Sequence, residues 1–179
     1  LLSRKYNLFY IEHNKYIGGR YSVLSEVGII PAYLMGVNIL KLKSKTLEYL
    51  DNSNKSFLQN NVLKISNLMG SKKFNILILL NYCPKLEKFL YWFQQLLAES
   101  LGKKNKGLLP VVSNAPKDHH SLLQLYLDGP KDKFFNIFSL EKKSNIKVNI
   151  YNKSINTFLN KKKINTIKVA QKKALVKTL

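Results

Sequence analysis

The sequence predicts an α/β protein in three layers, with a mostly parallel β-sheet between helices. Residues 74–80 contain the unbroken aliphatic run 76–80, which is typical of a central strand covered on both faces. A run that begins at Pro84 repeats apolar residues every three or four positions as far as Leu97, which indicates an amphipathic helix with proline in its first turn. Strand-like and helical stretches alternate in this way along most of the chain. Such alternation favours parallel strands joined by crossover helices.

The same patterns predict the remaining elements in order. Residues 7–11 are predicted as a short buried strand, and residues 22–37 as a helix that is broken or capped near Pro31. Helical spacing over residues 40–68 is interrupted by turn-prone residues 51–54. Further predicted elements are strands at residues 108–112, 134–140 and 146–151, a helix at 119–127, and a helical run up to residue 179. In folds of this class ligands bind where strands end and helices begin, so polar residues at such places are candidates for a site.

Composition favours a globular protein in a reducing compartment. The 179 residues are 45% hydrophobic and 11% aromatic, which suits one ordinary core and is too apolar for a disordered tail. Cys83 is the single cysteine, so no internal disulfide is possible. The longest aliphatic run, residues 76–80, is far shorter than the roughly 20 residues of a membrane helix. We therefore expect a cytoplasmic protein without a membrane partner.

The net charge of +20 raises the alternative of a nucleic-acid-binding protein, since clustered cations gain affinity for phosphate backbones by releasing counterions. The positive charge comes from 28 lysines and only two arginines, whereas arginine has the planar fork that suits bidentate contacts with phosphates and bases. Half of the excess charge lies in residues 141–179. A solvated basic face, or one that meets an acidic surface elsewhere, is the favoured interpretation, and we expect no nucleic-acid partner.

The first candidate site is the turn formed by Gly18, Gly19 and Arg20. A predicted strand is followed by two glycines, which permit a sharp turn and a close approach to a ligand, and a predicted helix begins at Ser22. Backbone N–H groups at a helix start, together with an arginine, form a suitable environment for an anion. The same residues are also typical of a tight turn with a surface arginine, and on this motif alone that interpretation is favoured.

The second candidate site is the pair Gln95 and Glu99 near the end of the predicted long helix. The two residues lie four positions apart and share one helix face. Gly102 is predicted to cap the helix in the left-handed conformation. The apolar residues at 96–98 and 101 are expected to remove water from the Glu99 carboxylate, which would make it a better general base. The alternative is an ordinary solvated glutamate beside a helix cap.

The third candidate site contains His119 and His120. Adjacent residues of a helix point about 100° apart, so the two rings are not expected to bind one metal ion together, and no cysteine or histidine spacing in the sequence suggests zinc. One histidine is expected to be a cap or surface residue, and the other is available for acid–base chemistry near neutral pH. The sequence therefore does not predict a metal site.

Taken in order, three segments resemble the signature sequences of one enzyme family. The segments are GGRYSVLSEVG, QQLLAESLGK and KDHHSLLQLYLDGPKDKFF, and they span residues 18–135. They resemble the glucose-6-phosphate isomerase family of glycolysis and gluconeogenesis, whose members have two sugar-isomerase (SIS) domains. The resemblance implies a three-layer SIS-type, flavodoxin-like sheet, here incomplete, and the reversible isomerisation of glucose 6-phosphate and fructose 6-phosphate through an enediolate. It also implies a homodimer, in the full-length form, that needs no cofactor.

The resemblance also implies a role for each candidate residue. Arg20 would lie against the reacting carbons of the sugar, with Gly19 beside it in the substrate-binding turn. Glu99 would be the base that moves a proton between C1 and C2, and Gln95 a substrate-binding amide. His120 would assist ring opening, either in its own subunit or, as the corresponding histidine of the family does, in the site of the neighbouring subunit. These residue types suit the chemistry, because proton removal beside a carbonyl needs a carboxylate and the enediolate needs a fixed cation.

The resemblance further predicts the place of this chain in a longer protein. Residues 1–55 would be the end of the first SIS domain with connector helices, and residues 56–179 most of the second SIS domain. The family's phosphate-binding loop is expected before Leu1 and its catalytic lysine after Leu179, so we expect an internal fragment. Lys15 and Glu26 depart from the family pattern in the loop around Arg20. The remaining alternative is a SIS-type domain that binds a sugar phosphate without catalysis.

Overall fold

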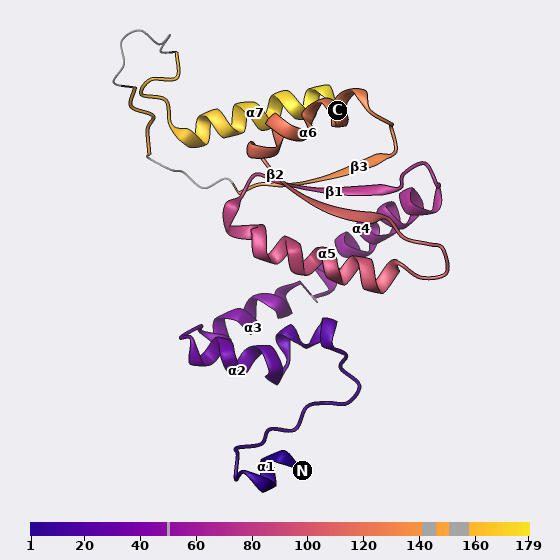
Figure 1. The fold of residues 1–179 in the computed structure, drawn as a ribbon, viewed down its shortest axis with the longest axis vertical. Helices are drawn as coiled ribbons and strands as arrows, with labels where there is room; N and C mark the ends of the chain where they lie inside the picture. Colours follow the sequence, from indigo (N-terminus) through magenta and orange to yellow (C-terminus); the bar gives the residue numbers. More distant parts are fainter. Residues whose placement is uncertain (50, 141–145, 151–157) are drawn as a thin grey trace. The chain divides into compact units, whose positions relative to one another are not determined.

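The computed structural model describes residues 1–49, 51–140, 146–150 and 158–179. The chain divides into two compact units, Leu1–Ser66 and Asn67–Leu179, which we call unit 1 and unit 2 and describe separately. The division lies within one long helix, α4 (Asn52–Gly70). The regular elements described for unit 1 are helices, whereas unit 2 contains the sheet (Figure 1).

Unit 2 is built on a three-stranded parallel sheet. Its strands are β1 (Ile76–Asn81), β2 (Leu109–Asn114) and β3 (Lys133–Phe138), in the order β2-β1-β3. β1 pairs in parallel with both neighbours along its whole length, so Asn81 lies opposite Asn114 of β2 and Phe138 of β3. The predicted parallel sheet, with its central strand within residues 74–81, is therefore confirmed.

Helices cover both faces of this sheet. The 3₁₀ turn η2 (Pro84–Leu86) and α5 (Glu87–Leu101) lead from β1 to β2, and α6 (Lys117–Asp128) leads from β2 to β3. α7 (Ile164–Thr178) lies beside α6, and α5 lies on the opposite face of the sheet (Figure 1). The predicted three-layer architecture is confirmed.

The core of unit 2 is centred on β1. Ile78 and Leu80 pack with Tyr126 of α6 and Leu175 of α7. Because side chains alternate along a strand, Leu79 points to the other face of the sheet, which α5 covers (Figure 1). Leu79 and Leu80 are both fully buried. A continuous aliphatic strand is thus explained by burial on both faces.

Unit 1 consists of short helices and connecting segments. Its elements are α1 (Leu2–Lys5), the 3₁₀ helix η1 (Gly19–Leu24), α2 (Glu26–Leu34), α3 (Ile39–Glu48) and the first part of α4. The helix predicted at residues 22–37 is two elements, since Ser25 is extended (φ −91°, ψ −176°) and separates η1 from α2. The predicted break near Pro31 is wrong, because Pro31 lies inside α2. The predicted interruption of the helical run is confirmed, but it lies earlier than residues 51–54, since α3 ends at Glu48 and α4 already begins at Asn52.

One predicted strand is absent from the structure, and a second is much shorter than predicted. Residues 8–11 have no regular structure, and Phe9 is 92% exposed. A strand needs a neighbour for its backbone hydrogen bonds, and no strand among the described residues pairs with this segment. The strand predicted at residues 146–151 is reduced to an isolated antiparallel bridge between Lys147 and Lys163, and residue 151 lies outside the described residues.

Leu79→Ala is expected to destabilise unit 2 by about 2–5 kcal/mol, because truncation of a buried leucine loses apolar contacts and leaves a cavity. Leu109→Ala is the matched control, since Leu109 is also a strand leucine but is 62% exposed. We expect a loss of about 0.5 kcal/mol or less there. Urea unfolding followed through the fluorescence of Trp92, the single tryptophan, measures both variants. Equal losses would contradict the central position of β1.

Candidate functional site

The turn at Gly18, Gly19 and Arg20 lies at the start of η1 in unit 1. Tyr21 N–H donates to Gly18 O (2.9 Å), and the Ser22 hydroxyl donates to Gly19 O (2.8 Å). Neither glycine has a positive φ, and a Cβ at either position would meet no described atom within 4 Å. The backbone conformation and the described neighbours therefore do not require glycine, and both residues border open space.

Arg20 extends from the first turn of η1 and is half-buried. Its guanidinium lies 5.6 Å from the centroid of the Tyr21 ring, which is a cation–π contact. This contact limits the positions that the long side chain adopts. The helix predicted to begin at Ser22 begins instead at Gly19 as a 3₁₀ helix, with Ser22 buried inside it.

Gln95 and Glu99 lie in the last turns of α5 in unit 2. Gln95 Nε2 donates a hydrogen bond to Glu99 Oε1 (2.9 Å), so the two side chains share one helix face as predicted. Both side chains are exposed, as are Ala98 and Leu101 beside them. The prediction that neighbouring apolar residues desolvate Glu99 is therefore wrong for this structure, because the apolar face of α5 is turned toward the sheet.

α5 ends at Leu101 and is capped by Gly102, whose N–H donates to Ala98 O (2.9 Å). The predicted left-handed cap is wrong, because φ of Gly102 is −74°. Glycine is required for a different reason, since a Cβ at this position would lie 2.5 Å from Ala98 O. The close approach of the backbone ends the helix directly after the turn that carries Glu99.

His119 and His120 lie in the first turn of α6 and have different environments. His119 is half-buried, its Nε2 is 2.9 Å from the hydroxyl of Tyr82, and the two rings meet edge to face. Burial lowers the pKa of His119, and Asp118 opposes this effect in part. Burial also raises the pKa of Tyr82 to about 12. His120 is exposed and is therefore the histidine that another molecule can reach.

A polar network that the sequence analysis did not identify lies at the carboxyl ends of β1 and β2. Asn81 Nδ2 donates to Asn114 Oδ1, and Asn114 Nδ2 donates to Glu87 Oε1, both at 2.9 Å. The Asn114 N–H donates to Asp118 Oδ2 (2.7 Å), and the Cys83 N–H donates to Asn81 Oδ1 (2.8 Å). The network connects both strand ends to the first turns of α5 and α6. The signal that could have identified it was an asparagine shortly after each of two predicted apolar strands, Asn81 after residues 74–80 and Asn114 after residues 108–112.

The candidate residues of unit 2 lie at opposite ends of the sheet. α5 returns the chain from the carboxyl end of β1 to the amino end of β2, so Glu99 lies near the amino ends of the strands. α6 begins at the carboxyl ends, where His120 lies. Strands of six residues span about 20 Å, which separates the two groups within one chain. Gly19 and Arg20 belong to unit 1, and their grouping with Glu99 stays a prediction.

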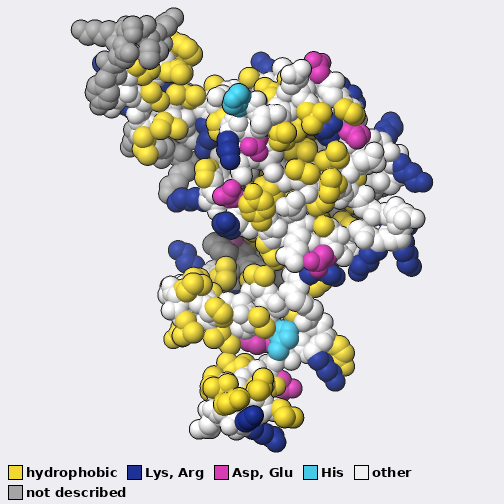
Figure 2. Space-filling model, in the orientation of Figure 1, with side chains coloured by type: hydrophobic (Ala, Val, Ile, Leu, Met, Phe, Trp, Pro, Cys, Tyr) yellow, Lys and Arg dark blue, Asp and Glu magenta, His cyan; other side chains and the backbone are white. Residues whose placement is uncertain are grey.

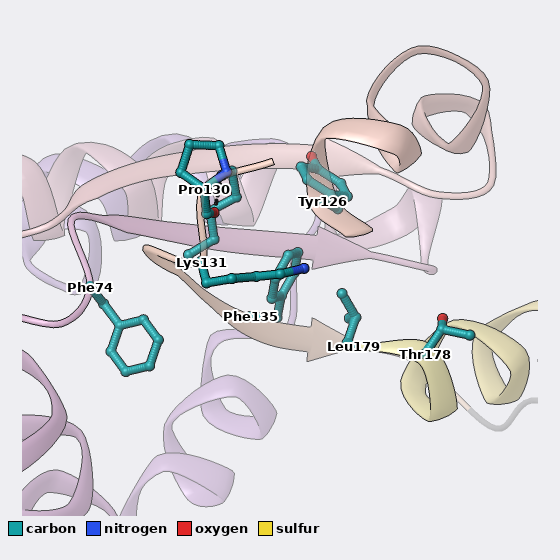
Figure 3. A pocket seen from close by; sticks show the side chains of 8 residues that line it. Phe74, Tyr126, Pro130, Lys131, Phe135, Thr178 and Leu179 are labelled. Carbon is teal, nitrogen blue, oxygen red and sulfur yellow. Dashed lines mark hydrogen bonds between the residues drawn. The ribbon is translucent and has the colours of Figure 1, made fainter. Parts of the chain in front are cut away.

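A pocket of about 180 Å³ lies at the amino end of the sheet. Figure 3 shows Tyr126, Lys131 and Phe135 around it, together with the last residues of α7. None of the candidate residues lines this pocket. It therefore does not mark the candidate site.

Lys and Arg side chains are spread over the visible face of unit 2 (Figure 2). This distribution favours a solvated basic surface over a single stripe that follows a nucleic-acid backbone.

Among the described residues, no group of three acidic, histidine or cysteine side chains is arranged to hold a metal ion. In the same part of the chain, no helix combines the length and the apolar character needed to cross a bilayer.

Acidification is expected to destabilise unit 2 through His119. Because burial lowers the pKa of His119 below its ordinary value of 6.5, the unfolded chain takes up this proton at a higher pH than the folded chain does. The neutral ring of His119 therefore makes its full contribution to the stability of unit 2 above pH 6.5. This contribution falls as the pH decreases toward the lowered pKa of His119. Urea midpoints from Trp92 fluorescence, measured between about pH 7.5 and pH 5, follow the effect.

His119→Gln should reduce this pH dependence, whereas His120→Gln, the same change at the exposed neighbour, should leave it unchanged. If the urea midpoint changed with pH equally in His119→Gln and in the original chain, His119 would not have different pKa values in the folded and unfolded states.

Comparisons with known proteins agree with the resemblance. Residues 5–115 match the family model of phosphoglucose isomerase. The matched range contains the Gly18–Arg20 turn and the Gln95–Glu99 pair, and it ends before His119 and His120.

Curated relatives of the chain are glucose-6-phosphate isomerases. The chain is 38% identical over 142 residues to the glucose-6-phosphate isomerase of Methanocaldococcus jannaschii, a similarity that covers 76% of this chain and 35% of the relative. It is 34% identical over 173 residues to the glucose-6-phosphate isomerase of Campylobacter jejuni, with 91% of this chain and 41% of the relative covered. The chain thus spans well under half of the length of these relatives.

A solved structure has a similar fold over almost the whole chain. The hypothetical protein TT0462 from Thermus thermophilus is similar with a TM-score of 0.78, over 99% of this chain and 45% of that chain. At 23% identity this similarity shows the fold alone. The family assignment depends instead on the family model, which matches more than half of the sequence. The chain belongs to the phosphoglucose isomerase family.

Proposed function

We propose that this chain is part of a glucose-6-phosphate isomerase, a cytoplasmic enzyme of glycolysis and gluconeogenesis that interconverts glucose 6-phosphate and fructose 6-phosphate. The observation that carries the proposal is the match of one family model to both the Gly18–Arg20 turn and the Gln95–Glu99 pair. The names of the relatives support a sugar phosphate as the substrate. Since the chain spans about a third of the Methanocaldococcus relative, the activity is proposed for the longer protein.

Glu99 is the proposed base that transfers a proton between C1 and C2 of the sugar. It lies at the carboxyl end of α5, where the negative end of the helix dipole disfavours the ionised form and so favours proton uptake. The hydrogen bond from Gln95 holds one carboxylate oxygen and so limits the rotation of the group. Gln95 is thus suited to orient the base and to contact the substrate with its remaining amide groups.

Arg20 is the proposed cation that stabilises the enediolate. Arginine stays protonated and cannot transfer a proton to the intermediate, so it contributes charge without ending the reaction early. The cation–π contact with Tyr21 restricts its side chain. The open space beside Gly18 and Gly19 supports a close approach of substrate to the backbone at this turn.

His120 is the proposed group that assists opening of the sugar ring, in the site of a neighbouring subunit. Its ring is exposed at the carboxyl ends of the strands, whereas Glu99 lies near the amino ends. One chain therefore does not bring both groups to the same substrate, but a homodimer of the full-length protein could do so. His119, which bonds to Tyr82, has a structural role in this scheme.

We assign residues 1–55 to the end of a first SIS domain with connector helices and residues 56–179 to most of a second. The parallel sheet of unit 2 with helices on both faces supports the second assignment. The competing proposal is a SIS-type domain that binds a sugar phosphate without catalysis. The exposure of Glu99 in this chain is the observation that favours it.

In the full-length protein, Glu99→Gln is expected to lower turnover by about 10²–10⁴-fold, the usual contribution of a general base, while substrate affinity changes little. The amide keeps the shape of the side chain but does not accept the proton. Exchange of solvent deuterium into fructose 6-phosphate measures the transfer directly. Glu87→Gln is the matched control at the other end of α5, since its amide oxygen can still accept from Asn114. Unchanged exchange in Glu99→Gln would support the non-catalytic alternative.

The 179-residue chain alone is expected to show no useful isomerisation of glucose 6-phosphate. Glu99 is exposed to water in this chain, whereas electrostatic stabilisation of an enediolate needs a site from which water is excluded. A coupled assay of the purified chain measures this, with Glu99→Gln as its control. Activity of the chain that disappears in Glu99→Gln would show that these residues already form a complete site.

A further inference from the structure

The loop that carries Arg20 is closed by a contact between residues on either side of it. His13 Nδ1 bonds to Glu26 Oε1, and His13 Nε2 is 2.9 Å from Ile17 O. The backbone N–H of Asn14 donates to the same Glu26 oxygen (3.2 Å). His13 precedes the turn, and Glu26 is the first residue of α2. The contact therefore joins the two ends of residues 13–26.

Both ring nitrogens of His13 meet groups that accept hydrogen bonds. A carboxylate and a backbone carbonyl have no proton to donate, so both nitrogens must donate, and only the protonated ring does so. The Ile17 carbonyl, followed by Glu26, accordingly raises the pKa of His13 above its ordinary value of 6.5. The backbone N–H of Glu26, followed by His13, lowers the pKa of Glu26 below 4.5.

Other charged and titratable groups lie in the same segment and in the helices η1, α2 and α3 of unit 1. They are Glu12, Lys15 and Tyr16 in the segment itself, Arg20 and Tyr21 in η1, Tyr33 in α2, and Lys41, Lys43 and Glu48 in α3. Glu26 is the one charged residue of α2. The interactions that raise the pKa of His13 come from Ile17 and Glu26, so the pair acts as one ionic unit.

Most hydrogen bonds inside the loop are local. Ile17 N–H donates to Asn14 O (3.0 Å), and Tyr21 N–H donates to Gly18 O (2.9 Å). Such bonds shape single turns, but they do not fix the position of the whole loop. The bond between His13 and Glu26 joins residues 13 positions apart and thus reduces the conformational freedom of everything between them.

We propose that His13 and Glu26 are positioning residues for Arg20, which hold its loop closed while His13 is protonated and release it when the ring loses its proton. The proposal rests on the proposed function, in which Arg20 faces the enediolate. Neither His13 nor Glu26 contacts the substrate in this scheme. They act through the backbone of the loop between them.

The sign of the pH effect follows from the two titrations. His13 is protonated below its raised pKa, and Glu26 is ionised above its lowered pKa. The contribution of the pair to loop closure is therefore fully present between pH 4.5 and pH 6.5 and is lost as the pH rises from 6.5 through the raised pKa of His13. Arg20 keeps its charge throughout, so the change concerns its position.

Amide hydrogen exchange and histidine NMR of the 179-residue chain test the proposal. After correction for intrinsic exchange, the amides of residues 16–25 should be about two- to fivefold better protected near pH 5.5 than near pH 8.5, the range given by an exposed ion pair. The ring of His13 should titrate above 6.5. A ring that titrates at or below 6.5 would overturn the proposal without any variant.

Three variants make the test specific. Glu26→Gln and His13→Gln should lower the protection near pH 5.5 to the level near pH 8.5 and so remove the pH dependence. Glu12→Gln removes the same charge one residue from His13 but outside the contact, and it should behave like the original chain. Amides of α3 should stay protected in all variants, which separates loop opening from unfolding of unit 1. A pH dependence that survives in both Glu26→Gln and His13→Gln would overturn the proposal.

In the full-length protein, Glu26→Gln should lower kcat/KM near pH 6 and converge with the unchanged enzyme at high pH, where His13 is neutral in both. If Glu26→Gln lowered kcat/KM equally at every pH, Glu26 would have a structural role, and the proposal that protonation of His13 positions the loop would be overturned. The exchange experiment does not depend on isomerase activity. Failure of the proposed function and failure of this inference are therefore distinguishable.

Discussion

Parallel pairing on both sides of β1 requires each connection to return the chain to the amino end of the sheet. α5 and α6 make these returns on opposite faces, as right-handed crossovers demand when the step from β1 to β2 and the step from β2 to β3 run in opposite directions across the sheet. Because α5 runs back along the sheet, its last turn takes Gln95 and Glu99 to the amino ends. The first turn of α6 keeps His119 and His120 at the carboxyl ends. The separation of the candidate groups thus follows from the strand order.

The carboxyl end of the sheet is held by buried polar side chains that satisfy one another. Asn81 is 1% exposed and uses both ends of its amide, one toward Asn114 and one toward Cys83 N–H. An unpaired amide at this depth would cost about 1–3 kcal/mol, so the network constrains the chain that leaves β1. That chain places Tyr82 against His119. Since neighbouring helix residues point about 100° apart, the inward position of His119 leaves His120 at the surface.

Elements whose hydrophobic pattern matches the burial of their side chains could be predicted from the sequence. Elements that form only through contacts with residues far along the chain could not. Residues 76–80 are apolar on both faces because β1 is covered on both faces, so composition and environment agree. Residues 7–11 have a similar composition, but no described strand accepts their hydrogen bonds. The helix face shared by Gln95 and Glu99 follows from spacing, whereas the exposure of Glu99 depends on what covers that face. Which histidine turns inward depends on Tyr82, 37 positions away, and no local pattern encodes it.

Two contacts at or beside the candidate residues span short stretches of sequence. Gln95 bonds to Glu99 four positions away, and His13 bonds to Glu26 13 positions away. Contacts of this kind form within one helix or one loop, because little chain entropy is lost in closing them. Exclusion of water from a carboxylate needs surfaces from separate elements, and Glu99 is exposed here. If Glu99 and Arg20 have their proposed roles, this chain orients each of them individually, and the enclosure that would make them reactive depends on further parts of the proposed enzyme.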